Sequence, residues 1–204
     1  TIAHSELLRE LGTGGFGSVY LARDTVSRTF VAVKGLPREV SDSKAEFERM
    51  RANFALVSKL KHTNVAAVLV LHQVGAVACG DSEVLRKLNV KSGDTLLVMD
   101  YAPGVTLEAW CRQFPDRKVP VDQAIEVTRQ IAAALDAAHK LKIVHRDVKP
   151  QNVMVETLSD GTFTARVLDF GLAAEVRSSV NRVSGDATKN SLGVYPYMSP
   201  EQFE

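Results

Sequence analysis

Short runs of alternating apolar and polar residues occupy the first half of the chain. The segments Ser18 to Arg23 and Thr29 to Lys34 alternate in this way and are rich in Val, Tyr, Phe and Thr, which predicts two strands around a turn at Asp24 to Arg28. Val65 to Val74 and Thr95 to Tyr101 are equally rich in apolar and β-branched residues and predict two further strands. We therefore expect a small antiparallel sheet of about five strands.

One helix is predicted beside this sheet, between Ser43 and Leu60. The residues Ser43 and Glu46 form an S-x-x-E capping box, which is typical of the start of a helix. Apolar side chains then recur every three or four positions, as expected for an amphipathic helix. They are Phe47, Met50, Phe54, Val57 and Leu60.

The pattern becomes helical after Pro103 and Gly104. Val121 to Lys140 predicts a long helix with an Ala-rich surface suited to close packing. We expect one of its faces to carry Ile125, Thr128, Ala132, Leu135 and His139.

These observations predict two lobes, residues 1–102 and residues 103–204. Residues 75–94 form an inserted loop within the first lobe, longer than a hairpin loop usually is, with a short helix expected at Ser82 to Leu88.

Charge and cysteine content exclude several classes of protein. The 204 residues include 25 basic and 24 acidic side chains, a net charge of +1, so nucleic-acid binding is not expected. The most apolar stretch, Val65 to Leu71, is far shorter than a membrane span. The two cysteines, Cys79 and Cys111, indicate no disulfide framework or zinc cluster, which fits a cytoplasmic protein.

The stretch LGTGGFGSVYLARD, residues 11–24, contains a G-x-G-x-x-G pattern at Gly12, Gly14 and Gly17. Glycines in such a loop let backbone N–H groups approach a phosphate. In a dinucleotide-binding fold the pattern follows a strand and opens a helix. Here a predicted strand follows it, which favours a loop at the tip of a β-hairpin.

Two runs in the second half combine charged and amide side chains with apolar flanks. They are IVHRDVKPQNVMV at residues 143–155 and RVLDFGLA at residues 166–173. Because of these two runs and the glycine stretch, the chain resembles the eukaryotic-type protein kinase family, Ser/Thr branch, and is most similar to bacterial members. The motifs are G-x-G-x-x-G-x-V at 12–19, V-A-V-K at 31–34, H-R-D-x-K-x-x-N at 145–152, D-F-G at 169–171 and S-P-E at 199–201.

This resemblance implies an α+β, bilobal fold and transfer of the ATP γ-phosphoryl group to Ser or Thr hydroxyls of a protein substrate. Lys34 would hold the α- and β-phosphates, and Asn152 and Asp169 would bind Mg²⁺. Asp147 would orient the proton of the substrate hydroxyl, and Lys149 would offset charge on the moving phosphoryl group.

The resemblance also implies an adenine pocket and a regulated segment. The expected nucleotide-binding residues besides Lys34 are Gly12, Gly14, Gly17, Val19, Ala32, Met99, Asp100, Ala102 and Met154. His145 is expected to be a packed structural residue, and Arg146 to receive a phosphate from the activation segment, residues 172–199. That segment offers Ser178, Ser179, Ser184, Thr188 and Ser191.

The chain departs from the family pattern at three points. The helix position where the family has a glutamate that pairs with the strand lysine falls on Asn53, and Val194 stands where a threonine is usual. Further helices are expected after Glu204, so we expect a C-terminally incomplete kinase domain.

Two functions follow from these patterns. The leading hypothesis is an ATP- and Mg²⁺-dependent protein Ser/Thr kinase. The alternative, motivated by Asn53 and Val194, is a pseudokinase that binds nucleotide or a partner and acts as a signalling module. Asp147, Asn152 and Asp169 argue against the alternative, since a scaffold has no need of metal ligands. A small-molecule kinase of related architecture is disfavoured by the S-P-E motif and the long activation segment. The oligomeric state cannot be derived from these patterns.

Overall fold

The chain forms two compact units, which are described in turn. The computed structural model describes residues 5–14, 17–75, 91–172, 175, 176, 178–180 and 197. The first unit contains residues 1–55, 68–101 and 175–190, and the second contains residues 56–67, 102–174 and 191–204. The segments 56–67 and 175–190 are therefore grouped differently from the ranges expected for the two lobes. The short helix expected at residues 82–88 lies outside the described residues.

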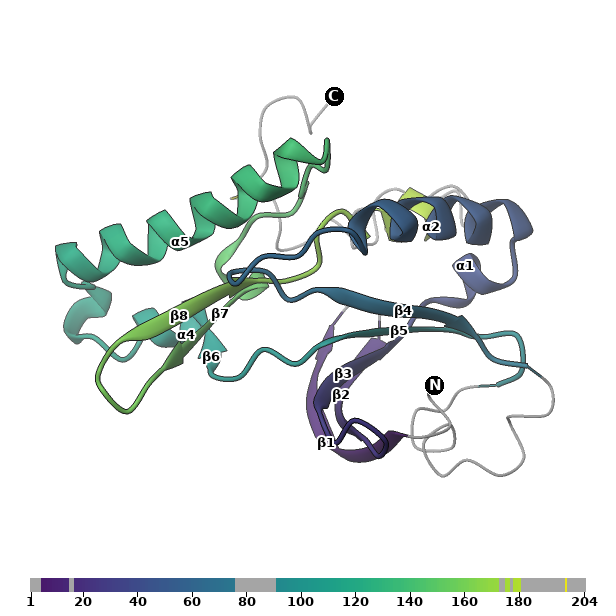
Figure 1. Cartoon of the computed structure of the whole chain (residues 1–204), viewed down its shortest axis with the longest axis horizontal. Helices are drawn as coiled ribbons and strands as arrows, with labels where there is room; N and C mark the ends of the chain where they lie inside the picture. Colours follow the sequence, from purple (N-terminus) through teal and green to yellow (C-terminus); the bar gives the residue numbers. More distant parts are fainter. Residues whose placement is uncertain are drawn as a thin grey trace. The chain divides into compact units, whose positions relative to one another are not determined.

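A five-stranded antiparallel sheet forms the first unit, as predicted (Figure 1). The strand order is β1-β2-β3-β5-β4. The strands are β1 (Ser5–Gly14), β2 (Gly17–Asp24), β3 (Phe30–Gly35), β4 (Val68–Gln73) and β5 (Thr95–Asp100). Because every neighbouring pair is antiparallel, short turns join β1 to β2 and β2 to β3.

The turn between β2 and β3 is held by Asp24. Its Oδ1 accepts hydrogen bonds from the backbone N–H of Val26 (2.9 Å) and of Ser27 (2.8 Å). These bonds lower the pKa of the Asp24 carboxyl, since they stabilise its charged form. Arg28 completes the turn with a positive φ of 59°. The turn predicted at Asp24 to Arg28 is therefore confirmed, and the structure shows that the Asp24 side chain holds it as an Asx turn.

The two faces of this sheet carry different side chains. One face holds a core cluster that consists of Leu7, Ala22, Val31, Val33, Val74, Leu96 and Val98. Side chains alternate along a strand, so Ala32 and Lys34 lie on the face opposite to Val31 and Val33. Val31 and Val33 of β3 thus belong to the core cluster, and Lys34 lies on the opposite face of the sheet.

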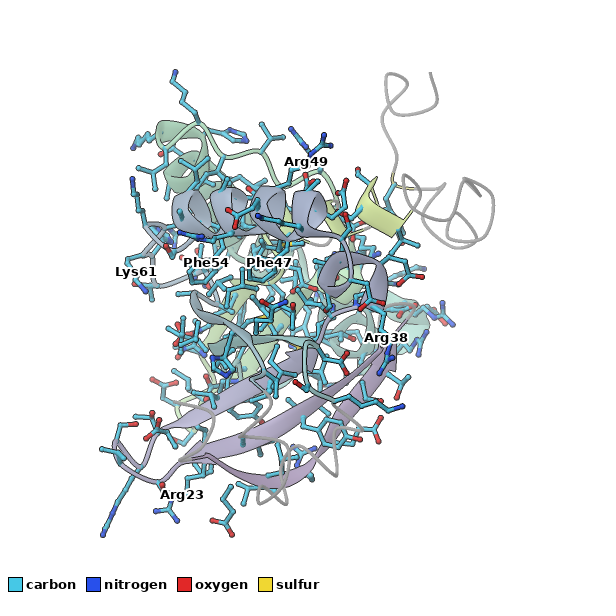
Figure 2. All side chains as sticks on the ribbon, turned by 90° about the vertical axis from the view of Figure 1, so that its right-hand side faces the viewer. Arg23, Arg38, Phe47, Arg49, Phe54 and Lys61 are labelled. Carbon is cyan, nitrogen blue, oxygen red and sulfur yellow. The ribbon has the colours of Figure 1, made fainter. Side chains whose placement is uncertain are left out.

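Two helices follow β3, namely α1 (Arg38–Ser41) in the first unit and α2 (Lys44–Val57), of which residues 44–55 belong to the first unit. Ser43 directly precedes α2, and its Oγ accepts a hydrogen bond from the Glu46 backbone N–H (3.4 Å). Phe47 and Phe54 project from a different side of α2 than Arg49 (Figure 2). Glu46, Met50 and Val57 are buried on α2. The predicted helix is confirmed, and it buries a carboxylate as well as apolar groups.

The second unit is built from a three-stranded sheet and helices. Its strands, in the order β6-β7-β8, are β6 (Val105–Thr106), β7 (Val153–Thr157) and β8 (Phe163–Val167). The helices are α4 (Leu107–Cys111), α5 (Val121–Lys140) and the short 3-10 turns η2 (Pro115–Arg117) and η3 (Pro150–Asn152). The strand β8 ends at Val167, so the D-F-G residues 169–171 follow this strand.

Gly104, directly before β6, is required by its surroundings. Its φ is +99°, and a Cβ at this position would lie 2.1 Å from the Val155 carbonyl oxygen. Val155 is the β7 residue that pairs with Val105. A side chain at residue 104 is therefore incompatible with the pairing of β6 and β7.

The helix α5 packs through a face that the sequence pattern did not indicate. The buried residues are Val127, Gln130, Ala134 and Ala138, whereas Ile125, Thr128, Ala132 and His139 are exposed. Burial of Gln130 is tolerated because both the oxygen and the nitrogen of its side-chain amide have hydrogen-bond partners. Its Oε1 accepts hydrogen bonds from the Ala165 backbone N–H (2.7 Å) and from Asn64 Nδ2 (2.9 Å). A polar residue therefore anchors α5 to β8, and apolar periodicity alone cannot find such an anchor.

Among the helices in the described part of the chain, none combines the length and the apolar character that crossing a lipid bilayer requires.

Candidate functional site

The glycine stretch lies at the tip of the β1–β2 hairpin. Gly12 pairs with Val19, Thr13 with Ser18 and Gly14 with Gly17. The stretch therefore joins two antiparallel strands instead of a strand and a helix, as predicted. A Cβ at Gly12 would meet no atom of the described structure within 4 Å. The fold itself does not demand a glycine there, so the bare backbone leaves room for a ligand.

A small polar cluster lies next to the tip of this hairpin. Thr13 Oγ1 donates to the Glu10 carboxylate and lies 2.9 Å from Ser18 Oγ. The hydrogen bonds from Thr13 and Ser18 lower the pKa of the Glu10 carboxyl. The cluster joins the two strands directly beside Gly12 and Gly14.

Lys34 lies on a face shared with three of the predicted adenine-pocket residues. In the strand registers Lys34 is opposite Val19, and Ala32 is opposite Met99. Directly opposed residues in antiparallel strands point to the same side of a sheet. The structure therefore brings Val19, Ala32, Lys34 and Met99 to one face of the first unit. Ala32 and Met99 are buried, and Lys34 is half-buried.

The remaining predicted adenine contacts lie at strand ends or in the second unit. Asp100 is exposed at the end of β5 and pairs with Val31. Ala102 and Met154 belong to the second unit, where Met154 lies in β7 opposite Thr106 and Arg166. The predicted pocket residues are thus divided between two units.

Asp147 is the centre of a polar network in the second unit. Its carboxylate is buried, and Oδ2 lies 3.0 Å from Lys149 Nζ and accepts a hydrogen bond from Asn152 Nδ2 (2.8 Å). Asn152 Nδ2 also donates to the Asp147 carbonyl oxygen (2.8 Å). The 3-10 turn η3 brings Asn152 back to Asp147. The structure thus joins three of the predicted site residues within one loop.

His145 ties this loop to the segment before the D-F-G residues. Its Nδ1 accepts a hydrogen bond from the Asp147 backbone N–H (3.2 Å), so Nε2 carries the proton and donates to the Leu168 carbonyl oxygen (2.8 Å). Burial lowers the pKa of His145 and outweighs the nearby Asp147 and Asp169 charges. A buried, neutral histidine with both nitrogens used is a structural residue.

Strained backbone flanks the network on both sides. Arg146 and Asp169 have positive φ values of 64° and 57°, which are uncommon for residues other than glycine. Phe170 is buried, and its ring lies edge-on to His145, with centroids 4.7 Å apart. The Leu168 backbone N–H donates to the Asn152 carbonyl oxygen (2.9 Å). These contacts hold the segment that carries Asp169 next to Asn152. Positive φ values at residues other than glycine, as at Arg146 and Asp169, are often found at functional sites.

The donor set of this loop fits a magnesium ion. Asn152 directs its amide nitrogen toward Asp147, so the amide oxygen is the atom of this side chain that could bind a metal. The described residues contain no cluster of three or more His, Cys, Asp or Glu side chains that could hold a metal by itself. Mg²⁺ typically takes one or two protein oxygens together with substrate phosphates, so an amide and a carboxylate suit it.

The structure also pairs two residues that the sequence did not connect. Ser179 Oγ donates a hydrogen bond to Glu46 Oε2 (2.8 Å), and both residues are buried. They are 133 positions apart, and no local pattern indicates such a contact.

Asn53 is half-buried on α2. Val194 and the segment serines and threonine at positions 184, 188 and 191 lie outside the described residues.

Comparison with protein families gives a match over nearly the whole chain. The family described as "Protein kinase domain" matches residues 5–204. The chain is 33% identical over 198 residues to the serine/threonine-protein kinase PknD of Mycobacterium tuberculosis, covering 97% of this chain and 26% of that protein. It is 31% identical over 199 residues to the probable serine/threonine-protein kinase PknB of Lactococcus lactis, with 96% and 27% covered. The chain therefore spans about a quarter of the length of these relatives.

Solved structures show the same fold. A crystal structure of the Mycobacterium tuberculosis PknI kinase domain, a double mutant, superimposes with a TM-score of 0.65 at 22% identity. The match covers 83% of this chain and 59% of that structure. The α+β fold with its five-stranded antiparallel sheet is thus the fold of a kinase domain.

Proposed function

The chain belongs to the protein kinase family, and from that premise we propose that it transfers the γ-phosphoryl group of ATP to Ser or Thr hydroxyls of a protein. The motifs quoted above and the relatives named serine/threonine-protein kinase support this activity. Since the chain spans 26% of PknD, the activity, substrates and partners of the whole protein are part of the proposal.

The observation that carries the proposal is the Asp147 network. A buried carboxylate held by a lysine at 3.0 Å and an amide at 2.8 Å is fixed in position before any substrate arrives. We assign Asp147 the role of accepting or orienting the proton of the substrate hydroxyl. Lys149, already beside this carboxylate, would offset negative charge on the phosphoryl group as it moves.

Asn152 and Asp169 are the residues we propose to hold Mg²⁺. When bound, Mg²⁺ neutralises charge on the phosphates. The contribution of the chain is to present the Asn152 amide oxygen and the Asp169 carboxylate from a backbone held by His145 and Leu168. Positioning of this kind is most of what phosphoryl transfer asks of a protein.

Further residues are proposed to bind the nucleotide. In the proposal Lys34 binds the α- and β-phosphates, and the backbone of Gly12, Gly14 and Gly17 covers them. Val19, Ala32, Met99 and Met154 would contact the adenine, whose edge would bond to the backbones of Asp100 and Ala102. The shared sheet face of Val19, Ala32, Lys34 and Met99 supports this assignment. The low cysteine content supports a cytoplasmic location for this part of the protein.

The test is phosphate transfer from γ-labelled ATP to a Ser/Thr protein substrate by the full-length protein, with Asp147→Asn as the variant. We expect transfer by the wild-type protein and a loss of about 100-fold or more in Asp147→Asn, since general acid–base groups contribute about 10²–10⁴-fold. Asp136→Asn is the matched control, because Asp136 is exposed on α5 and pairs only locally with Lys140.

Three outcomes are distinguishable. Transfer that is lost in Asp147→Asn and kept in Asp136→Asn supports the proposal. Transfer that Asp147→Asn leaves unchanged contradicts the role of Asp147. Nucleotide binding without transfer by the wild-type protein supports the alternative of a pseudokinase, which the replacement at Asn53 motivates.

A further inference from the structure

Two aromatic side chains are in contact where β3 begins and β5 ends. The rings of Phe30 and Tyr101 lie edge to face, with centroids 6.4 Å apart and planes inclined at 67°. Such a pair attracts beyond the burial of its area, because the positive edge of one ring approaches the negative face of the other. Both residues belong to the first unit. The contact therefore lies within one compact body.

The strand register explains why these two rings lie together. The last paired residues of β3 and β5 are Val31 and Asp100. Phe30 lies directly before this pair and Tyr101 directly after it, so they are the next opposed positions of two antiparallel strands. Phe30 is also paired with Arg23 of β2. The Phe30 ring is thus carried by a strand inside the sheet, whereas Tyr101 lies one residue past the end of β5.

The aromatic pair extends the sheet face that carries Ala32 and Lys34. Side chains alternate along a strand, so Phe30 lies on the same side of β3 as Ala32. Ala32 is opposite Met99, which precedes Tyr101 by two residues. The two rings therefore form the next row outward on the face that we assign to the adenine. Phe30 is 51% exposed, so shortening its side chain removes little core packing.

We propose that Phe30 is a positioning residue for the adenine, because its ring holds Tyr101 and with it the backbone on both sides of Tyr101. This inference rests on the proposed function, in which the base of ATP bonds to the backbones of Asp100 and Ala102. These two residues flank Tyr101 in sequence. A backbone that is already held in the receiving conformation loses less conformational freedom on binding, which strengthens affinity. Phe30 acts through Tyr101 and need not touch the nucleotide.

The strength of one aromatic pair sets the size of the expected effect. An edge-to-face pair is equivalent to about a two- to tenfold change in an equilibrium constant. Without the Phe30 ring, the chain around Tyr101 has more conformations available. Only the fraction in the receiving conformation binds the base. The affinity for ATP should therefore fall by about this factor.

Equilibrium binding of ATP with Mg²⁺ to the full-length protein measures this effect. We expect Phe30→Ala to weaken the affinity about two- to tenfold and Phe30→Tyr, which keeps a ring, to restore the wild-type value. Val26→Ala is the control and should change nothing, since Val26 is 75% exposed in the turn before β3. Wild-type binding that Phe30→Ala leaves unchanged overturns this inference alone. Absence of ATP binding by the wild-type protein overturns the proposed function and this inference with it.

A double-mutant cycle tests whether the ring contact is the cause. In a Tyr101→Ala background, Phe30→Ala should have no further effect on ATP affinity, because the contact is already lost. Effects of the two substitutions that simply add would overturn the proposal.

Steady-state kinetics separates positioning of the base from a general loosening of the fold. We expect Phe30→Ala to raise the KM for ATP, to leave the KM for the protein substrate unchanged and to keep kcat at or above the wild-type value. A loosened fold would instead reduce the folded fraction and lower kcat. A lower kcat at an unchanged KM for ATP would contradict the role of Phe30.

Discussion

The side chains around Asp147 show how single residues create a prepared site. Lys149 and Asn152 bind the carboxylate, and His145 binds the backbone on either side through both ring nitrogens. Each of these residues was recognisable from the H-R-D-x-K-x-x-N pattern. Their arrangement was not, because the tautomer of His145 and the orientation of the Asn152 amide depend on Leu168 and on the turn η3.

His145 gives a pH dependence whose sign follows from its burial. Because the pKa of His145 is lowered from 6.5, the folded protein binds fewer protons than the unfolded chain below that pH. The stability that comes from the neutral His145 is fully present above pH 6.5. As the pH falls through 6.5 toward the lowered pKa of His145, the free energy of unfolding decreases by up to about 1.4 kcal/mol per pH unit. We expect the loss of unfolding free energy between pH 7.5 and pH 5.5 to be smaller in His145→Gln.

Urea unfolding at the two pH values measures this difference. His139→Gln, at an exposed position of α5, is the control and should keep the wild-type pH dependence. An identical pH dependence in His145→Gln and the wild-type protein would show that His145 is not held neutral by burial.

The elements differ in how far their packing could be predicted from sequence. The sheet and α2 followed from apolar periodicity and from the Ser43 cap, since these are local signals. The buried face of α5 did not, because it is centred on Gln130, whose partners Asn64 and Ala165 come from other parts of the chain. The contact of Ser179 with Glu46 was equally hidden, since neither residue is apolar and 133 positions separate them.

Gly104 offers a test of how β6 joins the sheet of the second unit. Gly104→Ala combines a positive φ with a Cβ 2.1 Å from the Val155 oxygen. Gly161→Ala is the matched control, because Gly161 also has a positive φ (+83°) and a Cβ there meets nothing within 4 Å. We expect Gly161→Ala to cost about 1–2 kcal/mol of unfolding free energy, from backbone conformation alone.

Gly104→Ala should cost more than about 3 kcal/mol, since the backbone of β6 or β7 has to shift. Urea unfolding of both variants measures the difference. Equal costs in the two variants would mean that β6 moves aside freely, and the close approach to Val155 would then have no energetic importance.

Asn53 on α2 is the residue expected at the position of the family's lysine-pairing glutamate. An amide hydrogen-bonds a lysine without the charge that a carboxylate brings, and charge-assisted hydrogen bonds are roughly twice as strong as neutral ones. Asn53→Glu should therefore raise the rate of phosphate transfer several-fold, by holding Lys34 more firmly. Ala52→Glu, exposed on the same helix, adds the same charge elsewhere and is the control.

The comparison is made with steady-state transfer rates at saturating ATP. An unchanged or lower rate in Asn53→Glu would mean that Asn53 does not occupy the family's glutamate position. A similar rise in both variants would assign the effect to the general charge of α2.

The molecule as a whole divides its proposed chemistry between its two units. The first unit contributes Lys34 and the glycine hairpin, and the second contributes Asp147, Asn152 and Asp169. The five ordered motifs identified the family from sequence alone, and the roles of both sets of residues are proposals that follow from those motifs. The ranges 1–102 and 103–204 for the two lobes stay a prediction, and contacts in three dimensions group the segments 56–67 and 175–190 in a way that no local pattern indicates.

Equilibrium binding of ATP and Mg²⁺ to the full-length protein tests most directly whether Lys34 and Asp169 serve nucleotide binding. Lys34→Met and Asp169→Asn are each measured, with Lys140→Met and Asp136→Asn as surface controls. We predict that each site variant weakens ATP affinity about tenfold or more and that Asp169→Asn removes most of the Mg²⁺ dependence. ATP affinity that Lys34→Met and Asp169→Asn both leave at the wild-type value would contradict the proposal.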